Sequence, residues 1–142
     1  MSEDRWWRSL DPEVLAGELP PELMTRWKIV GIDGAGSLLT EYLDPGASRM
    51  AGTTYWTELK REFRALVCTE DEKYADVRRS LGSAGAEARV IAVAVISAAI
   101  GAELGFAAGA LAPFCLLCLI ALVRLGKEAF CTDRGWDDLE PK

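Results

Sequence analysis

The chain has 142 residues, a length that allows one domain or one small domain with an appendage. Hydrophobic residues make up 50% of it and charged residues 27%, a mixture typical neither of a disordered tail nor of a wholly membrane-buried protein. The net charge of −6 and the lack of any histidine argue against nucleic-acid binding, histidine triads and histidine-ligated metals.

The first segment, residues 1–54, predicts short helices and loops. Asp11 followed by Pro12 is the pattern of an N-cap with proline at the first helical position, and this helix is expected to end near Gly17. Pro21 starts a second helix. Its apolar side chains fall on one face: Leu23, Trp27 and Val30.

Residues 31–36 read Gly-Ile-Asp-Gly-Ala-Gly. This hexapeptide resembles the opening loop of the patatin-like acyl hydrolases and the phosphate loop of the sugar-kinase-like ATPases. The patatin family also needs a G-x-S-x-G nucleophile elbow, which the chain lacks, and the kinase-like fold needs a second lobe. We carry no function over from the resemblance. We expect a break between two helices here, with Ser37 capping a helix over residues 38–43.

The second segment, residues 55–85, predicts a pair of amphipathic helices. The first covers residues 55–68 and carries an apolar stripe of Trp56, Leu59, Phe63 and Val67. Its charged side chains are expected to face water: Lys60, Arg61, Glu62 and Arg64. Thr69 and Glu72 have the spacing of a capping box. The helix that follows carries Tyr74, Val77 and Leu81 and ends at Gly82.

The third segment, residues 86–130, contains the strongest signal. Residues 90–123 include a single charge, Glu103, and a run of about 18 such residues is typical of a membrane-spanning helix. One helix over this stretch would be about 51 Å long, against about 30 Å of hydrocarbon. It would also place Glu103 near its middle, at a cost of about 3 kcal/mol. We therefore expect an apolar helical hairpin of two short transmembrane helices, with Pro113 beginning the second.

The charges that flank the hairpin predict its orientation. Arg89 precedes the run, Arg124 and Lys127 follow it, and no basic residue lies in the intervening turn. By the positive-inside rule, both termini lie on the cytoplasm-like side of a multi-pass protein. The membrane-interface residues would then be Arg89, Glu103, Arg124 and Lys127. Residues 1–20 show no secretory signal. A soluble helical bundle with the hairpin as its buried core is the alternative interpretation.

Two further patterns indicate packing surfaces. Small residues recur at every fourth position and predict a close helix contact: Ser97, Gly101, Gly105 and Gly109. The glycines among them also suit the turn of the hairpin, and the sequence leaves both roles open. Trp6 and Trp7 lie between arginines. They suit a membrane interface, a small helical core or a partner-binding site.

The four cysteines do not form a recognisable catalytic or metal site. Cys115 and Cys118 have C-x-x-C spacing but lie inside the apolar run, where cysteine packs as a small hydrophobe. Cys68 and Cys131 flank that run, and a hairpin would bring them to the same side, where a disulfide or a shared contact could form. A reducing compartment would argue against the bond.

Taken together, these patterns predict an all-α fold: a small N-terminal helical region, the apolar hairpin and an acidic, exposed tail over residues 131–142. The sequence contains no recognisable set of nucleophile, base and metal ligands, so we expect no enzyme, cofactor or metal. The leading hypothesis is a structural or accessory subunit of a membrane assembly, whose partners are lipid and other subunits or itself, with no nucleic acid. The alternatives are an oligomerising, pore-forming effector and a soluble all-α adaptor.

Overall fold

The computed structural model of the chain describes residues 3–39, 49–82, 88–132 and 136. These residues form helices and turns with no strand among them, so the all-α fold class is confirmed. Most of the helix expected over residues 38–43 lies outside the described ranges. The elements in chain order are η1 (Glu3–Ser9), α1 (Pro12–Gly17), α2 (Pro21–Gly36), α4 (Arg49–Cys68), η2 (Glu72–Tyr74), α5 (Ala75–Gly82), α6 (Ala88–Leu104), α7 (Ala108–Leu125) and α8 (Lys127–Cys131).

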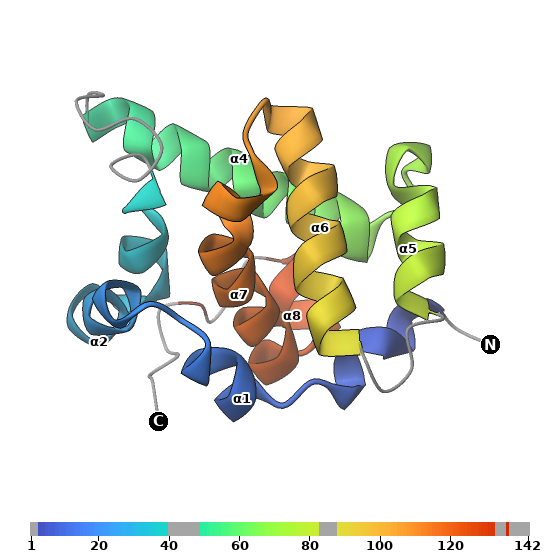
Figure 1. The fold of residues 1–142 in the computed structure, drawn as a ribbon, viewed down its shortest axis with the longest axis horizontal. Coiled ribbons are helices and arrows are strands. Elements are labelled where there is room, and N and C mark those ends of the chain that lie inside the picture. The colour runs from blue at the N-terminus through green and yellow to red at the C-terminus, as the bar shows by residue number, and fades with distance from the viewer. Residues whose placement is uncertain (1–2, 40–48, 83–87, 133–135, 137–142) are drawn as a thin grey trace.

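Helix α7 lies at the centre of the molecule and the other elements cover it. It packs against α6, α1, α8, α2 and η1. Figure 1 places α6 and α7 side by side in the middle, with α2 and α5 on opposite sides of them and α1 beneath. Residues 114–122 of α7 are all buried, and together with apolar residues from every other helix they form one hydrophobic core. The apolar run is therefore the centre of this core.

The hairpin itself differs in detail from the expected one. Its turn is short and lies at residues 105–107, where Gly105 has a φ of 85°, a left-handed conformation that favours glycine. Helix α7 consequently begins at Ala108, and Pro113 lies inside the helix and not at its first position. Gly126, with a φ of 86°, ends α7 and separates it from α8.

Only one helix in the described part of the chain is long and apolar enough to cross a membrane. It is Ala108–Leu125, with 18 residues and a mean hydropathy of 2.2, and 56% of this segment is buried inside the protein. The apolar stretch Val90–Leu104 of α6 is shorter than that length. The structure therefore gives no support to the two-span, multi-pass topology expected from the hairpin.

The N-terminal helices follow the local signals closely. The Asp11 side chain accepts a hydrogen bond from the Glu13 amide at 2.9 Å and caps α1, as predicted from Asp11 and Pro12. In α2, Leu23 and Trp27 are buried as expected, but Val30 is 49% exposed. The reason is Gly31, whose φ of 83° interrupts the helix and turns Ile32 toward the core instead.

Helices α4 and α8 are joined by a disulfide between Cys68 and Cys131, whose Cα atoms lie 5.9 Å apart. The C-terminal end of α4 is closed by Arg78 of α5, which donates hydrogen bonds to the Leu66, Ala65 and Asp71 carbonyls at 2.8–2.9 Å. Asp71, and not Thr69, accepts the hydrogen bond from the Lys73 amide that begins η2, so the cap lies two residues after the expected position.

The segment expected to be an exposed tail contributes to the core. Trp136 is only 2% exposed, and its ring lies 5.3 Å from that of Phe130 and 6.4 Å from that of Trp56, centroid to centroid. An exposed tail was therefore the wrong expectation for Trp136, because its aromatic surface is buried between α4 and α8.

Candidate functional site

The structure gives the small residues of the predicted packing stripe two different surroundings. The Gly101 carbonyl accepts hydrogen bonds from the Gly105 and Phe106 amides, each at 2.8 Å. A Cβ at Gly101 would lie 2.5 Å from the Phe106 carbonyl oxygen, which is too close for any other residue. Gly101 and Gly105 therefore shape the turn between α6 and α7.

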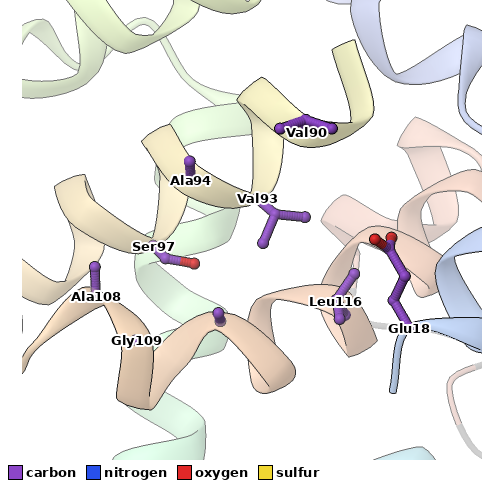
Figure 2. A pocket seen from close by; sticks show the side chains of 9 residues that line it. Glu18, Val90, Val93, Ala94, Ser97, Ala108, Gly109 and Leu116 are labelled. Carbon is purple, nitrogen blue, oxygen red and sulfur yellow. The ribbon is translucent and has the colours of Figure 1, made fainter. Parts of the chain in front are cut away.

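Ser97 and Gly109, the other members of the stripe, line a pocket on the flank of the hairpin (Figure 2). The pocket has a volume of about 350 Å³. Its walls come from both helices of the hairpin, and Glu18 lies at one end. The lining residues are Glu18, Val90, Val93, Ala94, Ser97, Ala108, Gly109, Ala112 and Leu116.

The hydroxyl of Ser97 is the notable group in this pocket. Ser97 is only 1% exposed, and within the described residues its Oγ has no hydrogen-bond partner. Figure 2 shows the side chain pointing into the space between α6 and α7. A buried hydroxyl without a hydrogen bond of ordinary geometry costs about 1–3 kcal/mol, and the thiol of Cys115 in α7 is a group with which Ser97 interacts.

Cys115 and Cys118 lie in the core beside this region and are completely buried. Burial raises the pKa of the Cys115 thiol to about 12, although the neighbouring Ser97 hydroxyl lowers it in part without forming a hydrogen bond of ordinary geometry. Burial also raises the pKa of the Cys118 thiol. Both thiols stay protonated at neutral pH, so neither is a nucleophile or a ready metal ligand.

A polar cluster that the sequence analysis missed joins α2 to α4. Asp33 Oδ1 accepts hydrogen bonds from Trp56 Nε1 and Lys60 Nζ, both at 2.9 Å. Lys60 was expected to face water, but it is 7% exposed, and its Nζ lies 4.2 Å from the centroid of the Trp136 ring. A Cβ at Gly36 would overlap the Trp56 ring. The Gly-rich segment thus allows α2 to approach α4.

This cluster has a structural explanation. Asp33 supplies the countercharge that a buried ammonium requires, and the faces of Trp56 and Trp136 cover the rest of Lys60. The sequence signal that could have predicted this cluster is Asp33 between Gly31 and Gly34, since an aspartate at a helix break projects away from the helix. The sequence alone does not say which cation it meets.

A second polar cluster links α4 to the turn before α5. Glu62 Oε1 accepts a hydrogen bond from the Tyr74 hydroxyl at 2.6 Å and pairs with Lys73 Nζ at 2.8 Å. Burial raises the pKa of Glu62, but the hydrogen bonds from Lys73 and Tyr74 and the nearby cations outweigh this, so the pKa is lowered overall. Burial and the bond to Glu62 raise the pKa of Tyr74.

The predicted interface and partner residues lie in different environments. Trp6 and Trp7 are 8% and 7% exposed and belong to the hydrophobic core. Glu103 is exposed. The hydrogen bond to Glu62 raises the pKa of Lys73, and the charge of Glu103 adds to this effect. The other predicted interface residues are Arg124 and Lys127, both half-buried, and Arg89, whose side chain is outside the described atoms.

In the described part of the chain, no three His, Cys, Asp or Glu side chains are grouped to hold a metal ion. Comparison with known proteins adds no function, because no family model, curated protein or solved structure matches the chain.

Proposed function

We propose that this chain is a non-enzymatic adaptor, an all-helical protein that folds around its apolar hairpin and binds a partner protein through the outer face of α6. The observation that carries the proposal is the burial of residues 114–122 of α7 on every side. A helix that faces lipid needs no protein cover, whereas the central helix of a water-soluble bundle does.

The elements that cover α7 support this interpretation. Leu15 of α1 and Trp27 of α2 are 0% and 2% exposed in the same core. If α7 moved into a bilayer, such side chains would lose their cover, at about 1.5–3 kcal/mol for each large apolar residue. The disulfide between Cys68 and Cys131 also holds α4 and α8 together beside the hairpin.

The outer face of α6 is the best candidate for the partner surface. Apart from Glu103 near the C-terminal end of the helix, its exposed residues are uncharged and mostly small: Val90, Ala94, Ala98 and Ala102. Between residue 90 and the end of α6, Glu103 is the only charged residue. An exposed helix face without charges is typical of a protein interface, and small side chains allow the backbone of a partner helix to come close.

Fractionation tests the first half of the proposal. After lysis without detergent and ultracentrifugation, we expect the chain in the supernatant and a folded, helical species in gel filtration. Recovery in a membrane pellet that resists alkaline carbonate would contradict the adaptor proposal. That result would favour the membrane-subunit and pore-forming hypotheses.

A charge placed on the α6 face tests the second half. Ala98→Arg adds a cation at an exposed helical position without a large loss of helix propensity. We expect it to release a partner that co-purifies with the unaltered protein, while the melting temperature changes little. Thr57→Arg on the exposed side of α4 is the matched control. A partner retained equally by both variants would exclude α6 as the binding face.

One observation favours a second candidate, a membrane subunit anchored by α7. This helix has 18 residues and a mean hydropathy of 2.2, which meet the length and composition of a membrane span. In such a protein α7 would cross once, and the two termini would lie on opposite sides. Carbonate-resistant pelleting together with opposite accessibility of tags at the two termini would support this candidate over the adaptor.

A further inference from the structure

We infer that the disulfide between Cys68 and Cys131 is a redox-sensitive latch, whose reduction by a dithiol allows α8 and Trp136 to separate from α4. The inference goes beyond the adaptor role and does not depend on it, since it concerns α4 and α8 and not the outer face of α6. Three features carry it: the accessibility of the bond, the glycine that precedes α8 and the aromatic contacts beside the bond.

The disulfide lies within reach of a reductant, whereas the other two cysteines do not. Cys68 and Cys131 are the last residues of α4 and α8, and both are half-buried. Cys115 and Cys118 are completely buried. Disulfides that solvent reaches are in general more labile than enclosed ones, and regulatory bonds belong to this class. A reductant can therefore attack this bond without first unfolding the core.

Helix α8 depends on its neighbours for its position. It has only five residues, and an isolated helix of that length does not persist in water. It follows Gly126, whose φ of 86° ends α7 and where an added Cβ would meet no atom within 4 Å. The space beside Gly126 is open, and a glycine backbone changes direction at small cost. Gly126 is thus the hinge about which α8 would leave α4.

Aromatic contacts hold this part of the chain on α4 beside the disulfide. The Phe130 ring of α8 lies 5.6 Å from the Phe63 ring of α4, centroid to centroid, and the Trp136 ring lies 6.4 Å from that of Trp56. Contacts of this kind open and close locally, because no covalent bond fixes them. While the disulfide is intact, the ends of α4 and α8 cannot separate. Reduction removes that restraint and lets the rings part.

The reduction is a thiol–disulfide exchange. A thiolate of the dithiol attacks one sulfur of the bond and forms a mixed disulfide, while the other cysteine leaves as a thiolate and takes up a proton. The second thiol of the reductant then attacks the mixed disulfide and releases the remaining cysteine. Two electrons and two protons pass to Cys68 and Cys131 in total, and the dithiol becomes a disulfide.

The test follows the tryptophan rings of the full chain, labelled with fluorinated tryptophan, by fluorine NMR before and after reduction with dithiothreitol. The shift of each resonance between light and heavy water reports how far solvent reaches the ring, and single tryptophan-to-phenylalanine variants assign the resonances. We expect the solvent-induced shifts of Trp136 and Trp56 to increase on reduction, while that of Trp27 in α2 stays the same. No change at Trp136, or exposure of all the tryptophans together, would overturn the proposal, because the bond would then be inert or would hold the whole fold.

A matched variant separates loss of the bond from other effects of the reductant. Cys68→Ser together with Cys131→Ser should give the reduced spectrum with and without dithiothreitol. In the unaltered chain, removing dithiothreitol and adding oxidised glutathione should restore the first spectrum. A double variant that keeps the spectrum of the unreduced chain, or a change that reoxidation does not reverse, would overturn the proposal.

Discussion

Asp33 and Lys60 form an ion pair with 2.9 Å between Oδ1 and Nζ, although 27 positions of sequence separate them. The two side chains are unequally exposed, 38% for Asp33 and 9% for Lys60. The ion pair therefore mainly compensates the desolvation of Lys60, because its ammonium lies beneath the Trp136 ring and has lost most of its hydration. The kink at Gly31 lies two residues before Asp33.

Removing the charge of Asp33 should destabilise the fold. Asp33→Asn keeps an oxygen that can accept the Trp56 hydrogen bond but removes the negative charge that pairs with the Lys60 ammonium. We expect a loss of about 2 kcal/mol in the free energy of unfolding, less than for a fully buried pair because Asp33 is partly solvated. Urea denaturation measures the loss. In the Lys60→Met background the same substitution should cost less, and an equal cost in both backgrounds would mean that the charge pair is not its source.

The disulfide should account for a large share of the stability. Cys68 and Cys131 are 63 positions apart, and closing a loop of that length stabilises the folded state by about 4 kcal/mol in the chain-entropy model. Replacing both with serine should lower the urea midpoint accordingly. Alkylation of the denatured, unreduced chain should label two cysteines, Cys115 and Cys118, and four after reduction. Four labels without reductant would contradict the bond.

The Glu62 and Tyr74 contact predicts the shape of the pH–stability curve. The folded-state pKa of Glu62 is lowered from 4.5, so its stabilising contribution is complete above pH 4.5 and is lost as the pH falls through the folded value. The folded-state pKa of Tyr74 is raised from 10.0, so its contribution is complete below pH 10 and is lost at higher pH. Unfolding midpoints measured from pH 3 to pH 11 should therefore fall at both ends.

Single substitutions separate the two limbs of that curve. Glu62→Gln should flatten the acid limb, and Tyr74→Phe should flatten the alkaline limb while costing about 1 kcal/mol at pH 7. Arg79→Gln removes an exposed ion pair with Asp76 and serves as the control, with little effect at any pH. Parallel curves for all three variants and the unaltered chain would show that this contact does not set the pH dependence.

The two glycines Gly101 and Gly109 should respond in opposite directions to alanine. Gly101→Ala places a Cβ against the Phe106 carbonyl oxygen and should destabilise the hairpin by about 1–3 kcal/mol. Gly109→Ala has open space and gains helix propensity, so it should stabilise by up to about 1 kcal/mol. The test compares the melting temperature of each variant with that of the unaltered chain. Equal shifts in melting temperature would mean that Gly101 does not pack closely against the Phe106 carbonyl.

The helices could be predicted wherever their signals are local. Asp11 and Pro12 begin α1 because a carboxylate next to a proline caps a helix whatever surrounds it. The stripe of Trp56, Leu59 and Phe63 predicted the buried side of α4, since a period of 3.6 residues turns one face inward. The candidate pocket could be predicted only in part from the sequence. Ser97 and Gly109 belong to the small-residue stripe, but the four-residue spacing does not distinguish these two pocket residues from Gly101 and Gly105, which form the turn.

Only the tertiary structure decided what surrounds each apolar segment. A helix such as α7 has the same composition whether lipid or protein covers it, so its sequence is compatible with both, and the burial of residues 114–122 depends on where α1, α2, α6, α8 and η1 pack. The same reason explains Trp136 and Lys60, which were expected to face water. The sequence by itself determined which residues are apolar and where helices with local capping signals begin, because those properties are local. The partners of those residues are non-local, and they depend on the whole chain.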